Sequence, residues 1–227
     1  MTPMIVFDLD GTLLDCQPRQ VALTRWLLEK RGELAFDAET FWLMKRNGAS
    51  TEQSLAEIYR NPELAQSVAK EWKNLVELPE WLALDQPLPG ALVALNQLHA
   101  SGNFLALLTA RTNAQGLRAT LKRLEMHSFF CHIEVVDPAE ATQKKADKLK
   151  AWKPAVFLGD TESDLKAANI AGTRFIALSW GQRSAGWLKS HGANACFPDM
   201  NSAIEYILEQ LPDWITTGSL GTYANPQ

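Results

Sequence analysis

Short apolar segments alternate with amphipathic stretches along most of this chain. The segments are rich in branched and aromatic residues and have the length of strands that are buried on both faces. Between the later segments, apolar residues recur at helical spacing, as in Ala91–Ala100. This alternation is typical of βαβ units, and we predict an α/β fold with a Rossmann-like parallel sheet and helices on both faces. The predicted strands are Met4–Phe7, Phe104–Leu108, Ile133–Val136, Ala155–Leu158 and Arg174–Leu178.

The stretch between the first two predicted strands shows helical spacing and no strand pattern. It runs from about Pro18 to Leu84 and is followed by the turn-forming sequence Pro87-Leu88-Pro89-Gly90. An insertion after the first strand of a parallel sheet lies over the carboxyl ends of the strands, where such sheets bind their ligands. We therefore predict a small α-helical cap domain, a core domain and a C-terminal tail. Their predicted bounds are 16–87 for the cap, 1–15 and 88–212 for the core, and 213–227 for the tail.

Composition narrows the classes of function. The chain has 227 residues, of which 46% are hydrophobic, so it can bury a large core. A net charge of -4 argues against a nucleic-acid surface, and no apolar run approaches the roughly 18 residues of a membrane span. Cys16, Cys131 and Cys196 are widely spaced, which favours neither a disulfide framework nor a zinc site. Without a signal-peptide pattern, we predict a cytoplasmic protein, and the sequence does not indicate its oligomeric state.

The sequence Asp8-Leu9-Asp10-Gly11-Thr12 directly follows the first predicted strand. Residues i and i+2 of a strand point to the same side, so the two carboxylates face one ligand site. One of them can act as a nucleophile and the other can move protons. The alternative is a pair of solvated turn acids, since Asp-Gly is a common turn signal.

Two other strand ends also carry polar groups. Thr109 precedes a helix start, where a hydroxyl and free N–H groups suit a phosphate oxygen, although a capping threonine is the simpler explanation. Asp160 ends the fourth strand and Asp164 follows one helical turn later. Bringing Asp8 close to Asp160 is costly without a cation, and Mg²⁺ is the ion that carboxylates and a phosphate would hold together.

Lysines are concentrated between the third and fourth predicted strands. Most of them suit a solvated helix face, but one should reach a phosphoryl group that lies among several aspartates. These lysines are Lys144, Lys145, Lys148, Lys150 and Lys153.

These motifs, in this order, resemble the haloacid dehalogenase-like hydrolase superfamily, in its phosphatase branch of the phosphoglycolate phosphatase-like type. The matching parts are the Asp8–Thr12 motif, Thr109, a lysine, and Gly159-Asp160 with Asp164, and the helical insertion matches a cap after the first strand. The resemblance implies a Mg²⁺-dependent phosphomonoester hydrolase that acts on a small soluble phosphorylated metabolite through an aspartyl-phosphate. The presence of Asp10 favours phosphoryl transfer over dehalogenation.

The resemblance also implies roles for individual residues. Asp8 attacks phosphorus, and Asp10 protonates the leaving oxygen and then activates water. Mg²⁺ is held by Asp8, Asp160 and the backbone carbonyl of Asp10, and Asp164 either binds the ion directly or supports one of its ligands. Thr109 binds a phosphoryl oxygen. Lys145 is assigned as the lysine of the motif, with Lys144 as the alternative. The other residues expected to contact the substrate are Gly11, Thr12, Ala110 and Arg111.

The substrate-reading part of the cap is the least determined. We predict that the basic loop Lys45-Arg46-Asn47-Gly48 faces the site and reads the leaving group, with a solvated basic turn as the alternative. A phosphomutase of the β-phosphoglucomutase-like type is the alternative function, with Arg19 as a further source of cap charge. Trp26 and Trp42 could line the pocket, although tryptophans at helical spacing more often form the core of a helical domain.

Overall fold

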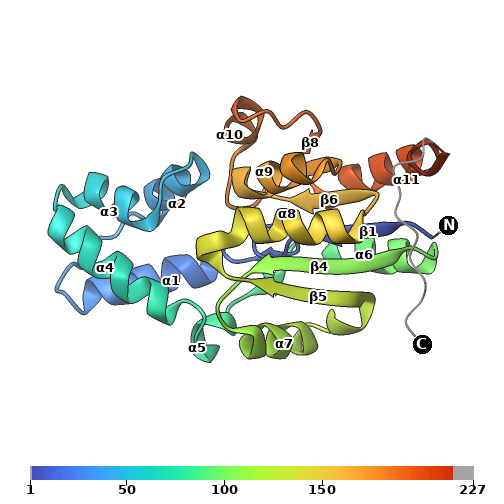
Figure 1. Cartoon of the computed structure of the whole chain (residues 1–227). Coiled ribbons are helices and arrows are strands. Elements are labelled where there is room, and N and C mark those ends of the chain that lie inside the picture. Colours follow the sequence, from blue (N-terminus) through green and yellow to red (C-terminus); the bar gives the residue numbers. More distant parts are fainter. Residues whose placement is uncertain (1, 217–227) are drawn as a thin grey trace.

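The computed structural model describes residues 2–216, and its centre is a six-stranded sheet in which every strand pair is parallel (Figure 1). The strand order is β5-β4-β1-β6-β7-β8, so the first strand lies inside the sheet. This arrangement confirms the predicted α/β fold. The strands are β1 (Met4–Phe7), β4 (Phe104–Ala110), β5 (Phe130–Val136), β6 (Val156–Gly159), β7 (Phe175–Leu178) and β8 (Cys196–Phe197).

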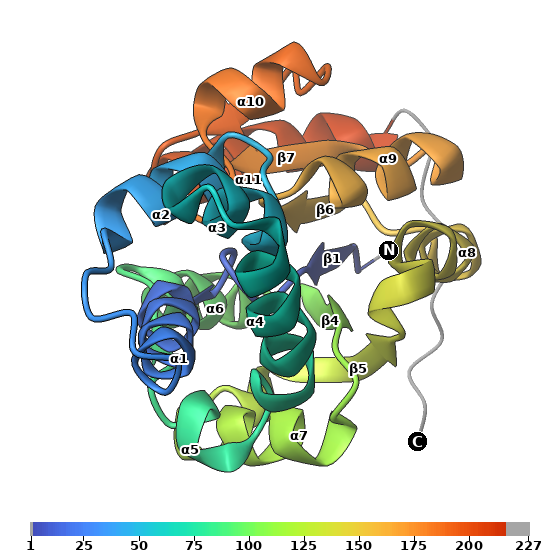
Figure 2. The ribbon, with the colours of Figure 1, turned by 90° about the vertical axis from the view of Figure 1, so that its left-hand side faces the viewer.

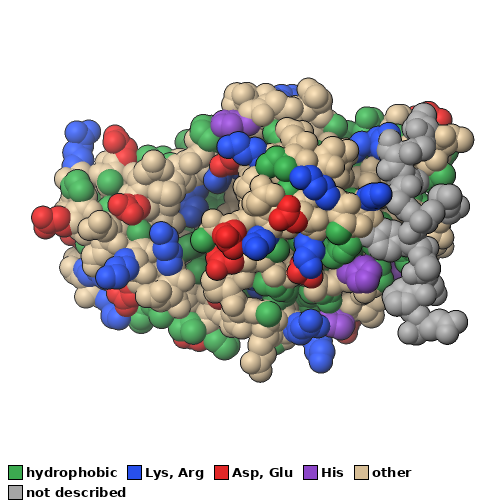
Figure 3. Space-filling view, viewed as in Figure 1, with side chains coloured by type: hydrophobic (Ala, Val, Ile, Leu, Met, Phe, Trp, Pro, Cys, Tyr) green, Lys and Arg blue, Asp and Glu red, His purple; other side chains and the backbone are tan. Residues whose placement is uncertain are grey.

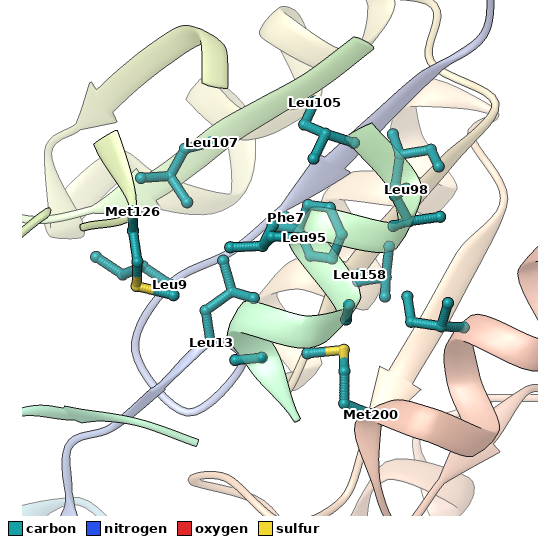
Figure 4. Packing of buried hydrophobic residues seen from close by; sticks show 14 of the residues in the cluster. Phe7, Leu9, Leu13, Leu95, Leu98, Leu105, Leu107, Met126, Leu158 and Met200 are labelled. Atoms are coloured by element: carbon teal, nitrogen blue, oxygen red, sulfur yellow. The ribbon is translucent and has the colours of Figure 1, made fainter. Parts of the chain in front are cut away.

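Helices cover both faces of this sheet. Helices α6 (Ala91–Ala100), α7 (Ala114–Arg123) and α11 (Met200–Thr216) supply apolar side chains to the cluster on one face. Figure 4 shows part of this cluster, in which Phe7, Leu95 and Met200 are packed together. Helices α8 (Ala141–Trp152) and α9 (Glu162–Ala171) supply the cluster on the other face. Each fully buried Leu or Phe stabilises the fold by about 1.5–3 kcal/mol, which makes β1 a fixed platform for the residues that follow it.

The helical segment between β1 and β4 forms a cluster of its own. Its helices lie in front of the carboxyl ends of the strands when the molecule is viewed along them (Figure 2). Strands β2 (Leu14–Asp15) and β3 (Gln86–Pro87) pair antiparallel where the chain enters and leaves this segment. We call its helices the cap helices. They are α1 (Gln17–Glu29), α2 (Ala38–Arg46), α3 (Thr51–Tyr59), α4 (Pro62–Leu75) and α5 (Pro79–Leu82).

Several boundaries differ from those predicted. Lys45 and Arg46 lie in the last turn of α2 rather than in a loop, because the turn begins only at Asn47. Helix α11 continues to Thr216, past the start predicted for the tail at residue 213, because Ile207 and Leu211 anchor its apolar face. The rest of that tail, 217–227, lies outside the described residues. The short elements that were not predicted are β2, β3, β8, α10 (Ala185–Ser190) and the 3₁₀ turns His127–Phe129 and Pro138–Glu140.

Two further expectations concern the whole chain. No helix in the described residues combines the length and the apolar character that a membrane crossing needs. Cys16, Cys131 and Cys196 are all free thiols in this structure.

Candidate active site

Three buried carboxylates meet at the carboxyl ends of β1 and β6. The two strands pair in parallel with Phe7 opposite Leu158, so Asp8 and Asp160 emerge from neighbouring strand ends. Asp164 lies in the first turn of α9, and its carboxylate closes a capping box with Thr161. One oxygen each from Asp8, Asp160 and Asp164 lie within 4.8 Å of one another. We call these three residues the carboxylate cluster.

Lys145 is the cation that reaches this cluster. Its Nζ donates to Asp8 Oδ1 at 2.7 Å and to Asp164 Oδ1 at 2.6 Å. Lys145 is buried on helix α8, whereas Lys144 is exposed and its Nζ lies 3.8 Å from Oε2 of Glu140, the residue before that helix. Of the two lysines considered from the sequence, the structure therefore brings Lys145 to the strand ends.

Burial makes the negative charge of the cluster costly. Burial raises the pKa of Asp8 to about 7, although the Lys145 ammonium opposes the shift. The pKa of Asp160 is also raised well above its ordinary value, by burial and by the charges of Asp8 and Asp164. Burial alone would lower the pKa of Lys145, but the charges of Asp164 and Asp8 outweigh it and raise that pKa above its ordinary value. Three carboxylates against one ammonium, with oxygen donors only, form a set that could hold a hard divalent cation.

The backbone around Asp160 is packed so closely that side chains are excluded at two points. Gly11 has a φ of +85°, and a Cβ atom there would lie 2.0 Å from Asp160 Oδ2. A Cβ atom on Gly181 would lie 2.2 Å from the carbonyl oxygen of Gly11. The Asp160 carboxylate accepts hydrogen bonds from Thr12 Oγ1 at 3.2 Å and from the N–H of Gln182 at 2.6 Å, which fixes its orientation.

The side chain of Asp10 contacts two arginines. Arg111 donates from Nε and Nη2 to its two oxygens, each at 2.7 Å, and Arg19 donates from Nη2 at 2.5 Å. Burial alone would raise the pKa of Asp10, but the charges and hydrogen bonds of Arg111 and Arg19 outweigh it and hold that pKa well below its usual range. The backbone carbonyl of Asp10 accepts from Gln182 Nε2 at 3.2 Å.

The end of β4 differs from the expectation in one respect. Thr109 is buried near the end of β4, the strand beside β1, and Ala110 is the last residue of that strand. Two N–H groups just before α7, however, already have a partner within the chain. Those of Thr112 and Asn113 donate to the Glu77 carboxylate at 3.0 and 2.7 Å, near the helix start where a phosphate oxygen was expected.

A cleft of about 610 Å³ lies between the cap helices and the strand ends, and the space-filling view shows a hollow between these parts (Figure 3). Asp10, Arg19 and Arg111 line it. A second cavity of about 310 Å³, here the cap cavity, shares Gln20, Trp72, Lys73 and Gln182 with the cleft. Neither Trp26 nor Trp42 is among the lining residues; Trp26 packs against Trp81 and Trp42 is buried.

Lys45 lines the cap cavity as a buried cation. Its Nζ donates to Thr51 Oγ1 at 2.9 Å and lies 4.9 Å from the centre of the Trp72 ring. Within the described residues no carboxylate forms an ion pair with it, and burial lowers its pKa to about 8. Its neighbour Arg46 lines neither space, because its guanidinium donates to the carbonyl of Ser179 in the core.

Several contacts around Asp10 have no signal in the sequence. Asp85 is fully buried and pairs with both arginines, and burial raises its pKa while those arginines oppose the shift. Gln182 comes from the loop after β7 and has no motif to mark it. Asp85 lies two residues before the Pro-rich boundary, and only its apolar neighbours Leu82 and Leu84 could have suggested burial.

Several known proteins are similar to this chain in sequence. Residues 5–178 match the family described as haloacid dehalogenase-like hydrolase. Phosphoglycolate phosphatase from Cereibacter sphaeroides is 29% identical over 198 residues, covering 81% of this chain and 88% of that protein. The same enzyme from Synechococcus elongatus is 27% identical over 184 residues, covering 78% and 84%.

The fold has counterparts among solved structures. A predicted phosphatase from Clostridium acetobutylicum superimposes with a TM-score of 0.70 at 20% identity, covering 92% of this chain and 99% of that one. A haloacid dehalogenase-like hydrolase from Streptococcus pneumoniae gives 0.68 at 22%, covering 91% and 98%.

The chain belongs to the haloacid dehalogenase-like hydrolase family, since the family match spans most of its length. Within that family it is an enzyme of the phosphatase branch.

Proposed function

We propose that this phosphatase is a Mg²⁺-dependent phosphomonoester hydrolase that works through an aspartyl-phosphate on Asp8. The observation that carries the proposal is the meeting of Asp8, Lys145, Asp160 and Asp164 at two neighbouring strand ends. A buried carboxylate with one fixed cation and two further carboxylates beside it suits a nucleophile that attacks phosphorus, and Asp10, two residues further along the chain, lines the cleft.

The residues divide the chemistry between them. Asp8 forms the bond to phosphorus, and Lys145 offsets the charge of the phosphoryl oxygens, with Thr109 as a further donor. Asp10 delivers a proton to the leaving oxygen and then accepts one from water. Arg19 and Arg111 favour the carboxylate form of Asp10, which is the form that activates water.

The metal is proposed to bind the carboxylate cluster, with the backbone carbonyl of Asp10 as a further ligand. Mg²⁺ would supply positive charge to the phosphate and would lower the repulsion between Asp8 and Asp160. Buried Asp160, held by Thr12 and Gln182, presents its carboxylate in one orientation, which supports this assignment.

The proposed substrate is a small phosphorylated hydroxy acid, with phosphoglycolate as the first candidate. The curated relatives carry that enzyme's name, and the buried cation of Lys45 gives the cap cavity a partner for a carboxylate. We propose a cytoplasmic location, which the free cysteines support.

The direct test is phosphate release from a panel of small phosphomonoesters, with Mg²⁺ or with EDTA. We expect turnover of phosphoglycolate and related acids with Mg²⁺ and its loss with EDTA, restored when Mg²⁺ is added back. Equal rates in EDTA would contradict the metal assignment, and no release from any ester by folded protein would contradict the hydrolase.

Lys45→Met tests whether the Lys45 ammonium recognises a carboxylate of the substrate. We expect KM for a phosphorylated carboxylic acid to rise by about 10- to 100-fold, because a charge-assisted hydrogen bond contributes about 1.5–3 kcal/mol. We expect KM for p-nitrophenyl phosphate, which has no carboxylate, to change little. Lys70→Met, an exposed lysine on α4, is the matched control.

The same variant should be more stable than the wild type at pH 7. The folded-state pKa of Lys45, about 8, lies below the ordinary 10.5, so the ammonium destabilises the fold below pH 8. This shift corresponds to about 3 kcal/mol, offset in part by the lost hydrogen bond to Thr51. As the pH rises from 8 to 10.5 the wild type gains stability, so the two unfolding free energies should converge. An equal difference at pH 7 and pH 10.5 would show that desolvation of the charge is not the cause.

A further inference from the structure

Asp85 lies against the two arginines that hold Asp10. Its Oδ1 is 3.1 Å from Arg19 Nε, and its Oδ2 accepts from Arg111 Nη2 at 3.3 Å. Arg19 contacts Asp85 through Nε and donates to Asp10 from Nη2. Arg111 donates to both carboxylates from its Nη2. The four side chains form an alternating arginine–aspartate cluster with two charges of each sign.

Asp85 itself is fixed from several directions. It directly precedes β3, where the chain returns from the cap helices to the core, and its side chain is fully buried. Its backbone carbonyl accepts from Arg123 Nη2 at 2.9 Å, and its N–H donates to the carbonyl of Leu82 at 3.2 Å. Arg123 lies in the last turn of α7, so the core helix holds this segment in place.

The cluster explains how two buried cations can share one small carboxylate. Arg19 comes from α1 and Arg111 from the residue after β4, and both side chains are almost completely buried. Without Asp85, two guanidinium groups would compete for Asp10 alone, and their mutual repulsion would move one of them away. A buried charge that loses its partner is costly, so the side chains would rearrange.

We propose that Asp85 is a positioning residue for catalysis: through Arg19 and Arg111 it holds the Asp10 carboxylate in the orientation that accepts a proton from the attacking water. The inference rests on the proposed function, in which Asp10 is that acceptor. Asp85 contacts neither the substrate nor the carboxylate cluster, and it acts only through the arginines.

The step that depends on Asp85 is the second half of the reaction. The water oxygen forms a bond to phosphorus, and the bond from phosphorus to the Asp8 oxygen breaks with its electron pair returning to the Asp8 carboxylate. The proton of the water goes to Asp10. The first half, with p-nitrophenolate as the leaving group, needs little protonation because that group leaves readily as an anion.

Asp85→Asn should therefore slow the second half selectively. In rapid mixing with p-nitrophenyl phosphate and Mg²⁺, we expect the rate constant of the first nitrophenol burst to stay within about 3-fold of the wild type, and the steady-state rate to fall by about 10- to 100-fold, part of the 10²–10⁴ that a positioned proton acceptor contributes. A purely structural defect would lower burst amplitude and steady-state rate in proportion. Unchanged rates, or a burst rate constant that falls as far as the steady-state rate, would overturn the inference.

Three further variants make the test decisive. The double variant Asp85→Asn/Arg19→Gln removes one charge of each sign, and it replaces the single variant in the test if Asp85→Asn unfolds. It should show the same selective loss of the steady-state rate. Glu71→Gln removes a carboxylate that bridges Lys30 and Arg31 on the cap, and its kinetics should match the wild type. Asp10→Asn should show the selective loss at least as strongly. If Asp10→Asn turns over normally, the proposed role of Asp10 is wrong; if only Asp85→Asn turns over normally, the inference alone is wrong.

Discussion

Asp8→Asn is expected to abolish turnover of every phosphomonoester, with kcat lowered by about 10⁴-fold or more, because an amide cannot form the proposed phosphoenzyme. The fold should tolerate the change. The pKa of Asp8 is raised to about 7 by burial, so its charge costs stability as the pH rises from about 4 towards 7. Lys145 keeps Asp164 as a partner, at 2.6 Å.

The measurement combines phosphate release with thermal unfolding at pH 7.5. We expect no detectable release and a midpoint equal to or above that of the wild type. The matched control is Asp147→Asn, an exposed carboxylate on α8, which should leave both quantities unchanged. Residual turnover near the wild-type rate would remove Asp8 from the role of nucleophile.

Lys145→Met is expected to cost both activity and stability. It leaves the buried carboxylates of Asp8 and Asp164 without their shared cation, and losing one partner of a buried ion pair typically costs about 3–5 kcal/mol. Activity should fall by about 10³-fold, as when one preorganised donor is removed from a reacting oxyanion.

Unfolding in urea with EDTA present isolates the contribution of the ammonium. We expect the double variant Lys145→Met/Asp164→Asn to recover part of the lost stability, since it removes one of the stranded charges, but none of the activity. If the single variant were as stable as the wild type, the short contacts of Lys145 would not reflect a strong interaction.

Much of the fold followed from local patterns. The apolar segment Met4–Phe7 and the later strands are short, branched and bounded by turns, so they predicted the parallel sheet that the structure shows. Since parallel strands bring their carboxyl ends to one edge, the expectation that Asp8 and Asp160 lie close together came from the same argument.

The remaining features depend on contacts between segments that are far apart in sequence. Asp85 and Arg111 are brought together only when β3 and β4 are in place, and neither shows a local signal of pairing. Near the helix start after β4, the N–H group of Asn113 contacts the carboxylate of Glu77, an anion from a distant part of the chain that no local pattern indicates. The charge of Arg46 predicts a contact with the substrate, whereas its contact with the Ser179 carbonyl depends on how the cap helices pack on the core.

The most direct test of the central claim is to look for the phosphoryl group on Asp8. The enzyme is mixed with Mg²⁺ and either phosphoglycolate or p-nitrophenyl phosphate, and the reaction is quenched in acid within milliseconds. The protein is then digested, and the mass and sequence of the peptide containing Asp8 are determined by mass spectrometry. The account predicts a phosphoryl group on Asp8, more of it in Asp85→Asn, and none in Asp8→Asn. If the wild type released phosphate at its full rate and no phosphoryl group were found on Asp8 at any quench time, in the wild type or in Asp85→Asn, the account would be contradicted.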